Sequence, residues 1–239
     1  MAKTARTFTG RTVELDSPNS LPFLEEQLNL QTISAVNAYR RLFPQVELSF
    51  YLISVTALIV ARQKQLGTES LEETLAEVRQ HMDTERRYFA EQITALLKKL
   101  EPASKRDTPS VRYTHPETGP AEYRTPEAAH YLALIKQLEQ ACQMIHQAYF
   151  AGLLSAPEKL AKEQTLQNRV IRLGRFINSA TRHRVTQIMR GDTKDKITSS
   201  TTESASEDES ETDEREEREG QQLLSVVKHA ITTEVRSQL

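Results

Sequence analysis

The chain has 239 residues, enough for one or two domains, and its 31 basic and 33 acidic residues give a net charge of −2. Its single cysteine, Cys142, excludes an intrachain disulfide framework and fits a reducing cytoplasm. The polar N-terminus lacks the apolar segment of a secretory signal, and seven glycines with no tryptophan favour a mainly helical protein.

The charge is distributed unevenly along the chain. Residues 192–239 contain 13 acidic and 6 basic residues, a net charge of −7, so residues 1–191 carry a net charge of +5. A basic body with an acidic tail is more typical of a polyanion-binding protein than the total charge indicates.

Residues 1–19 form a basic arm, in which Lys3, Arg6 and Arg11 precede the first acidic residue. Two interpretations remain open for this arm. It is either a flexible terminus or a segment that reaches DNA phosphates.

Residues 20–101 are predicted to form the helical core and dimerisation region. A first helix is expected over 20–43, because Pro44 interrupts the helical pattern there. A second, apolar helix is expected over 46–66. The most apolar run, Val46–Ala61, is shorter than a membrane span and contains polar residues, so it is interpreted as a buried core helix.

A third helix is predicted over 70–101. Ser70 and Glu73 have the spacing of a capping box at its start, and Pro102 marks its end. The apolar residues follow a nearly heptad pattern, which favours packing against another helix. They are Leu71, Leu75, Val78, Met82, Phe89, Ile93, Leu96 and Leu100.

Residues 102–125 are predicted to be a linker followed by a β ribbon. The β-favouring hexads 110–115 and 120–125 flank the turn-forming residues 116–119, which indicates a small hairpin. The bordering prolines are typical of an edge element of a sheet.

Residues 126–191 are predicted to be a basic helical hairpin. Thr125 and Pro126 suit the start of the first helix, and Gly152 suits its end. Ser155 and Glu158 form a second capping box, after which Leu166, Val170, Leu173 and Ile177 make an apolar stripe. The arginines of this second helix are concentrated in a region with few acidic residues. They are Arg169, Arg172, Arg175, Arg182, Arg184 and Arg190.

This concentration of guanidinium groups has three interpretations. It is a solvated surface, a surface that binds an acidic protein segment such as the tail, or a surface that binds the phosphates of DNA or RNA. Phosphate binding is favoured because arginine suits bidentate contacts with phosphates and guanine edges.

Residues 192–239 are expected to be a disordered acidic tail, because they contain too few apolar residues to offset the entropy of ordering. A short helix over 223–235 is expected only on a partner.

Catalytic motifs are not recognisable in this sequence. The six histidines lack metal-ligand spacing, and Cys142 lies on the apolar seam of the helix that starts at Pro126. We therefore expect neither an enzyme nor a cofactor, a metal, a small-molecule ligand or a membrane segment.

Two segments resemble a known family. Residues 148–155 have an aromatic–small–glycine–aliphatic turn, and residues 169–177 have the arginine-rich pattern of a second helix. Together they resemble the AcaB-type conjugation regulators and related uncharacterised proteins of integrative and conjugative elements and plasmids, an extended ribbon-helix-helix family.

This resemblance implies a mainly α fold, a long-helix bundle with a short β ribbon, and a homodimer that binds DNA. It makes Arg112 and Arg124 of the ribbon candidates for contacts with base edges. It also implies that the helix starts at Thr125 and Ser155 present N–H groups to phosphates. The expected helices are longer than those of usual ribbon-helix-helix motifs.

The sequence therefore predicts a cytoplasmic bacterial DNA-binding protein, nucleoid-associated when bound, that regulates transcription of a conjugative element. The predicted DNA-binding residues are Lys3, Arg6, Arg11, Arg112, Arg124, Thr125, Arg169, Arg172, Arg175, Arg182, Arg184 and Arg190. The alternative is a helical interaction or assembly protein of the same element that does not bind DNA.

Overall fold

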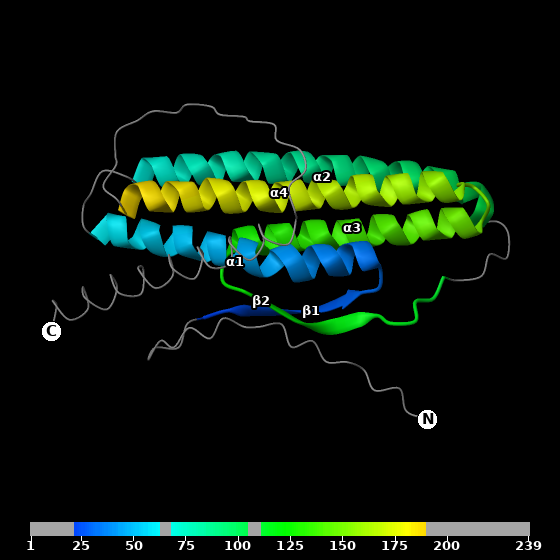
Figure 1. Ribbon diagram of the computed structural model, residues 1–239, viewed down its shortest axis with the longest axis horizontal. Helices are drawn as coiled ribbons and strands as arrows, with labels where there is room; N and C mark the ends of the chain where they lie inside the picture. Colours follow the sequence, from blue (N-terminus) through cyan, green and yellow to red (C-terminus); the bar gives the residue numbers. More distant parts are fainter. Residues whose placement is uncertain (1–21, 63–67, 105–110, 190–239) are drawn as a thin grey trace, which may run out of the picture. The chain divides into compact units, whose positions relative to one another are not determined.

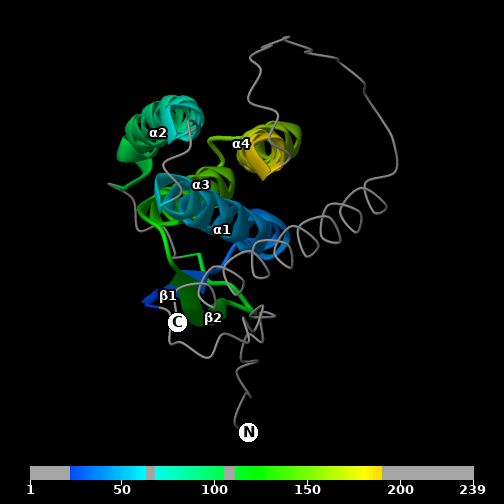
Figure 2. The same ribbon diagram turned by 90° about the vertical axis from the view of Figure 1, so that its left-hand side faces the viewer.

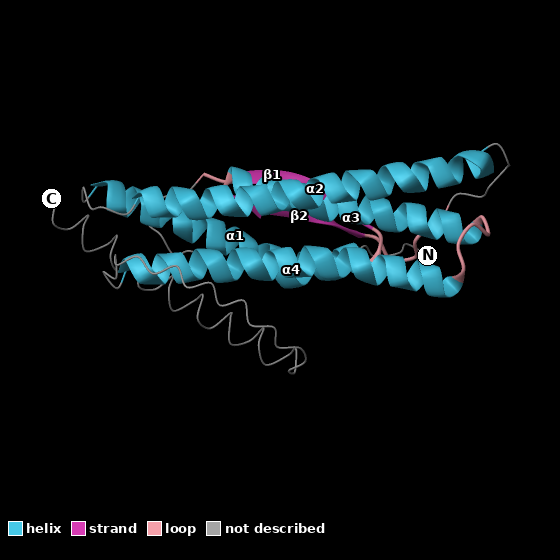
Figure 3. Ribbon diagram, turned by 90° about the horizontal axis from the view of Figure 1, so that it is seen from above, coloured by secondary structure: helices cyan, strands magenta, loops and turns pink. Residues whose placement is uncertain are grey.

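The computed structural model describes residues 22–62, 68–104 and 111–189. These residues form four helices and a two-stranded antiparallel ribbon, so the predicted mainly helical fold with a short β ribbon is confirmed (Figure 1, Figure 3). The basic arm, Arg190 and the acidic tail lie outside the described residues.

The elements follow the order β1 (Leu24–Leu30), α1 (Ile33–Arg62), α2 (Thr68–Ser104), β2 (Glu117–Tyr123), α3 (Pro126–Phe150) and α4 (Ala156–Met189). The chain divides into two compact units. Unit 1 comprises Met1–Glu47 and Arg79–Phe176, and unit 2 comprises Leu48–Val78 and Ile177–Leu239, so α1, α2 and α4 contribute to both.

The ribbon consists of β1 and β2, which lie 87 residues apart in the chain and pair from Leu24↔Tyr123 to Leu30↔Glu117. The predicted hairpin between 110–115 and 120–125 is therefore wrong. Its proposed turn, 116–119, largely belongs to β2 instead. The second strand comes from residues 24–30, where a helix was predicted.

Strand β1 alternates between a packed and a solvated face, which explains why it is not helical. Leu28 and Leu30 are buried, whereas Glu25, Gln27 and Asn29 are exposed. Thr32 then caps α1, because its hydroxyl accepts a hydrogen bond from the N–H of Ala35. The predicted helix over 20–43 consequently begins only at Ile33.

Helix α1 continues through Pro44, where the sequence predicted a break. Proline lacks an N–H, so the helix loses one hydrogen bond at this point, and Pro44 is exposed to solvent. Similarly, α2 already includes Thr68 and so does not begin at Ser70, whose carbonyl accepts a hydrogen bond from Thr74 within the helix.

The predicted starts of α3 and α4 agree with the structure. Thr125 caps α3 at the N–H of Ala128, and the N–H and hydroxyl of Ser155 both donate to Glu158 at the start of α4. These hydrogen bonds lower the pKa of the exposed Glu158 carboxyl. Gly152 ends the α3 turn with a φ of 71°, a conformation that glycine adopts without strain.

In unit 1, the core is built around α3. One side of this helix carries the buried residues Tyr131, Ile135, Leu138 and Ile145. Gly174 allows α4 to approach α3 closely, because a Cβ at this position would lie 2.5 Å from the Tyr131 hydroxyl. The first part of α1 and α3 separate the ribbon from α2 and α4, as the end-on view shows (Figure 2).

In unit 2, a smaller apolar cluster joins three helices. It contains the buried residues Ile53, Leu71 and Val185, against which Ala57, Leu75, Ile188 and Met189 pack. The hydroxyl of Ser49 also donates to the Asn178 carboxamide oxygen at 2.9 Å.

Helix α1 is long and apolar enough, by length and composition, to cross a membrane over Ile33–Ala61. However, 56% of its most apolar window is buried inside the protein, which is typical of the core helix of a globular protein.

Two buried carboxylates join the ribbon to the helices within unit 1. Glu139 of α3 accepts hydrogen bonds from the N–H groups of Gln31 and Thr32, both at 3.0 Å, and from the Thr32 hydroxyl at 2.6 Å. Glu47 of α1 accepts from the guanidinium of Arg124 at 2.9 Å, directly after β2. Burial raises the pKa of Glu47, and Arg124 opposes this effect.

We expect Glu139→Ala to lower the free energy of unfolding by about 3 kcal/mol, because it leaves two N–H groups at the start of α1 without their acceptor. Urea denaturation measures this loss. Glu139→Gln keeps one acceptor oxygen and should cost less, and Gln140→Ala is the exposed neighbouring control. Equal stability of Glu139→Ala and Gln140→Ala would contradict the role of this carboxylate.

Candidate nucleic-acid interface

From Lys162 to Arg175, the exposed side of α4 in unit 1 is basic and carries no exposed acidic residue, whereas the exposed Glu158 lies one turn before it. We call it the α4 basic face, and its exposed residues are Lys162, Thr165, Asn168, Arg172 and Arg175. They recur every three or four residues, opposite the buried stripe of Leu166, Val170 and Leu173. The stripe fixes which side of the helix reaches solvent, and it directs these cations outward.

Arg172 and Arg175 have no ion-pair partner among the described residues. Glu163, the acidic residue nearest to them on α4, is engaged elsewhere, since its carboxylate lies 2.6 Å from His146 and 3.7 Å from Lys159. The two guanidinium groups are therefore available to an external anion without breaking a contact within the described part of the chain.

Arg169 is instead part of the packing between α2 and α4. Its Nε and Nη2 donate to the two oxygens of Glu85 at 2.7 and 3.0 Å, and its guanidinium lies 3.7 Å from the centre of the Tyr88 ring. A bidentate pair with a stacked aromatic ring holds an arginine firmly. The structure thus places this predicted DNA-binding residue in an internal contact.

Two further predicted residues, Arg182 and Arg184, belong to unit 2 and are half-buried. The Nε of Arg184 donates to the carbonyl of Ser70 at 3.1 Å, and its Nη1 donates to Gln187 at 3.2 Å. Arg184 thus keeps its charged group hydrogen-bonded to polar groups of α2 while its side chain is half-buried.

The ribbon forms a second surface in unit 1. Its outer face, the side turned away from the helices, consists of Glu25, Gln27, Asn29, Thr118, Pro120 and Glu122. Asn29 lies opposite Thr118 in the register, and Glu25 lies opposite Glu122. One end of this outer face is therefore neutral and polar, and the other end is acidic.

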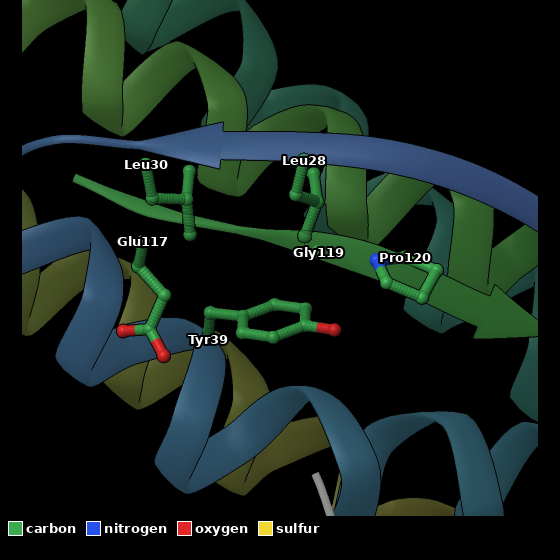
Figure 4. Close-up of a pocket in the computed structure, with 6 residues that line it drawn as sticks. All are labelled: Leu28, Leu30, Tyr39, Glu117, Gly119 and Pro120. Carbon is green, nitrogen blue, oxygen red and sulfur yellow. The ribbon is translucent and has the colours of Figure 1, made fainter. Parts of the chain in front are cut away.

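The inner side of the ribbon packs on α1. Leu28 and Leu30 lie over the ring of Tyr39, and Glu117, Gly119 and Pro120 complete the lining of a shallow hollow (Figure 4). Burial, together with the Glu117 and Glu122 carboxylates, raises the pKa of Tyr39 to about 12. A largely apolar hollow filled by a tyrosine ring supports the strands and offers little room for a ligand.

The cations around the ribbon are mostly paired. Arg40 donates to Glu117 at 2.5 Å, Lys136 contacts Glu26, and Arg124 contacts Glu47. Arg124 directly follows β2, and its guanidinium is engaged by the buried Glu47 of α1. Arg112 is exposed and lies five residues before β2.

Thr125, predicted to offer N–H groups to phosphate, is buried and already caps α3. The first turn of α3 also contains the buried Glu127, whose carboxylate accepts from Arg79 at 2.5 Å. At the start of α4, Ser155 is exposed, but its N–H donates to the Glu158 carboxylate. The positive helix ends are thus occupied by acidic groups of the protein.

A contact that the sequence did not reveal holds the segment before β2. The hydroxyl of Tyr113 lies 2.7 Å from Nδ1 of His146, whose Nε2 lies 2.6 Å from Glu163. Burial raises the pKa of Tyr113 to about 12, so this hydroxyl stays protonated. This chain of contacts holds Tyr113, the neighbour of Arg112, against α3 and α4. The three residues lie far apart in the sequence, so no local motif predicts the contact.

In the described part of the chain, no group of three or more histidine, cysteine or acidic side chains is arranged so that it could hold a metal ion. Cys142 is buried, and burial raises the pKa of its thiol to about 12. A protonated, inaccessible thiol acts as a core residue.

The fold is similar to that of a solved protein. The crystal structure of selenomethionine-containing AcaB from uropathogenic E. coli superimposes with a TM-score of 0.62 at 20% sequence identity, covering 72% of this chain and 86% of that chain. No protein-family model matches the sequence, and no curated protein matches it significantly. The chain therefore has an AcaB-like fold, and the identity is low enough that the similarity concerns the fold alone.

The two classes of arginine on α4 should differ in their effect on stability. We expect Arg169→Ala to lower the free energy of unfolding by about 1–2 kcal/mol, because it removes a half-buried bidentate pair and the contact with Tyr88. Arg172→Ala should change it by less than about 0.5 kcal/mol. Urea denaturation of both variants tests the distinction, and an equal loss of stability would contradict it.

Proposed function

We propose that this protein is a DNA-binding transcriptional regulator of a conjugative or integrative element, that it acts in the bacterial cytoplasm, and that it has no enzymatic activity. The observation that carries the proposal is the α4 basic face, on which Arg172 and Arg175 are exposed and unpaired within the described chain. Exposed arginines without an ion-pair partner along a helix are typical of phosphate contacts.

The fold supports the same proposal. The chain resembles AcaB-type conjugation regulators in its sequence motifs, and it has an AcaB-like fold with a two-stranded ribbon. Asparagine, glutamine and threonine side chains, which suit hydrogen bonds with base edges, lie on the ribbon outer face. In this proposal the ribbon reads bases and the α4 basic face holds phosphates.

The two surfaces lie on opposite sides of the layer formed by α3 and the first part of α1 (Figure 1, Figure 2). They therefore contact different stretches of DNA. The base contacts and the phosphate contacts should accordingly be separable by mutation, with little effect of one on the other.

The double variant Arg172→Ala/Arg175→Ala should weaken binding to every DNA sequence and reduce the slope of log K against log salt by about 2. Fluorescence anisotropy between 50 and 200 mM salt measures both quantities. The reason is that each arginine releases about one counterion from a phosphate.

The matched control is Arg86→Ala/Arg87→Ala, which removes the same charge from exposed positions on α2 near Asp83 and Glu91. It should change the salt slope much less. Equal effects of the two double variants would show that only overall charge matters. Absence of binding to any DNA at 50 mM salt would favour the alternative, a helical interaction or assembly protein without DNA binding.

A further inference from the structure

The chain contains two copies of the same local arrangement. The element order reads as β1–α1–α2 followed by β2–α3–α4, and both strands have seven residues. The interval from Leu24 to Glu117, the first residues of the strands, is 93 residues. The interval from Ile33 to Pro126, where the following helices begin, is also 93 residues. Strand, connection and helix start therefore correspond without insertion or deletion.

The two helix starts use the same cap at the same offset. The Thr32 hydroxyl accepts from the N–H of Ala35, and its carbonyl accepts from Val36. The Thr125 hydroxyl accepts from Ala128, and its carbonyl accepts from Ala129. Each residue of the second set lies 93 positions after its counterpart in the first.

Each copy is also fixed by a carboxylate from the other copy. Glu139 of α3 binds the N–H groups of Gln31 and Thr32, and Glu47 of α1 binds the backbone and side chain of Arg124. Gln31 and Arg124 are themselves equivalent at the offset of 93. The contact is thus reciprocal to within one residue, because Glu47 and Glu139 lie 92 positions apart, and it resembles the contact in a symmetric dimer although both partners belong to one chain.

The strand register agrees with this equivalence. Gln27 pairs with Pro120, which is its own counterpart at the offset of 93. The pairs on either side, Glu26↔Ala121 and Leu28↔Gly119, are equivalent to each other at the same offset. A local two-fold axis therefore passes through the Gln27–Pro120 pair. The helices obey the same relation, because α1 and α3 leave opposite ends of the ribbon and run in opposite directions (Figure 1).

The side chains on the ribbon outer face do not obey the two-fold relation. Equivalent positions carry Glu25 and Thr118, Gln27 and Pro120, or Asn29 and Glu122. No pair of equivalent residues on this outer face is the same. The backbone is thus nearly symmetric, whereas the chemistry that it presents is not.

We propose that one chain supplies a complete two-stranded reading surface, and that this surface binds an asymmetric, non-palindromic DNA site. This inference rests on the proposed function. A ribbon built from two identical chains presents the same residues twice and therefore matches a two-fold symmetric site. Here a single chain provides both strands, and the two halves carry different side chains.

The two ends of the ribbon outer face also indicate what each half of the site contains. Asn29 and Thr118 lie opposite each other at one end and Gln27 adjoins them, and amide side chains pair with adenine in the major groove. Glu25 and Glu122 lie opposite each other at the other end, and a carboxylate accepts from the amino group of cytosine. The site thus combines an adenine-containing half with a cytosine-containing half.

Selection from random duplex DNA with the full chain, followed by native mass spectrometry of the complex, tests this inference. The expected result is an enriched motif without two-fold symmetry, bound by one chain of 27.2 kDa per site. An enriched palindrome bound by two chains, or binding without any enriched motif, would overturn the inference and leave the proposed function standing. Failure to bind any duplex at low salt would instead overturn the proposed function.

Two variants assign the halves of the motif. Asn29→Ala should relax the preference only in the adenine-containing half, by about tenfold in the affinity ratio of preferred to substituted base. Glu122→Ala, at the equivalent position of the other strand, should relax it only in the cytosine-containing half. Relaxation of both halves by either variant would show that the two strands read the same sequence, which contradicts the inference.

Discussion

The arrangement of unit 1 depends on two carboxylates that join the ribbon to the helices. Glu139 and Glu47 are both buried, and each binds the chain where the opposite strand leads into its helix. A buried carboxylate is tolerated only when donors surround it, so the two strand-to-helix junctions must stay in place. The paired strands and the directions of α1 and α3 follow from this reciprocal contact.

The structure also divides the arginines of α4 into those that bind other side chains of the protein and those that are exposed to solvent. Arg169 faces Glu85 and Tyr88 and stabilises the packing of α2 against α4, whereas Arg172 and Arg175 face solvent within the next two turns. A count of positive residues in the sequence treats all three alike. Only the position of the buried stripe, together with a partner 84 residues away, separates the arginine that is held in an internal ion pair from the arginines that are available to an external anion.

The sequence predicted elements whose signals are local and missed those that depend on distant pairing. Thr125, Pro126 and Ser155 marked helix starts because capping requires only neighbouring residues. Residues 24–30 were predicted to be helical, since Leu24 and Leu28 fit both a helical and an alternating pattern. Their pairing with β2 decides in favour of a strand. The repeat at an offset of 93 was also missed, because its copies share a backbone arrangement but few residues.

The most direct test of the account is whether both strands of the ribbon come from the same chain. Asn29→Cys and Thr118→Cys place two thiols opposite each other on the ribbon outer face, and Cys142→Ala removes the native thiol. Non-reducing electrophoresis with intact-mass analysis after mild oxidation measures the outcome. The account predicts an intrachain disulfide in a monomer that has lost two hydrogen atoms. A disulfide-linked dimer, reversible on reduction, would show that the strands pair between chains and would contradict it.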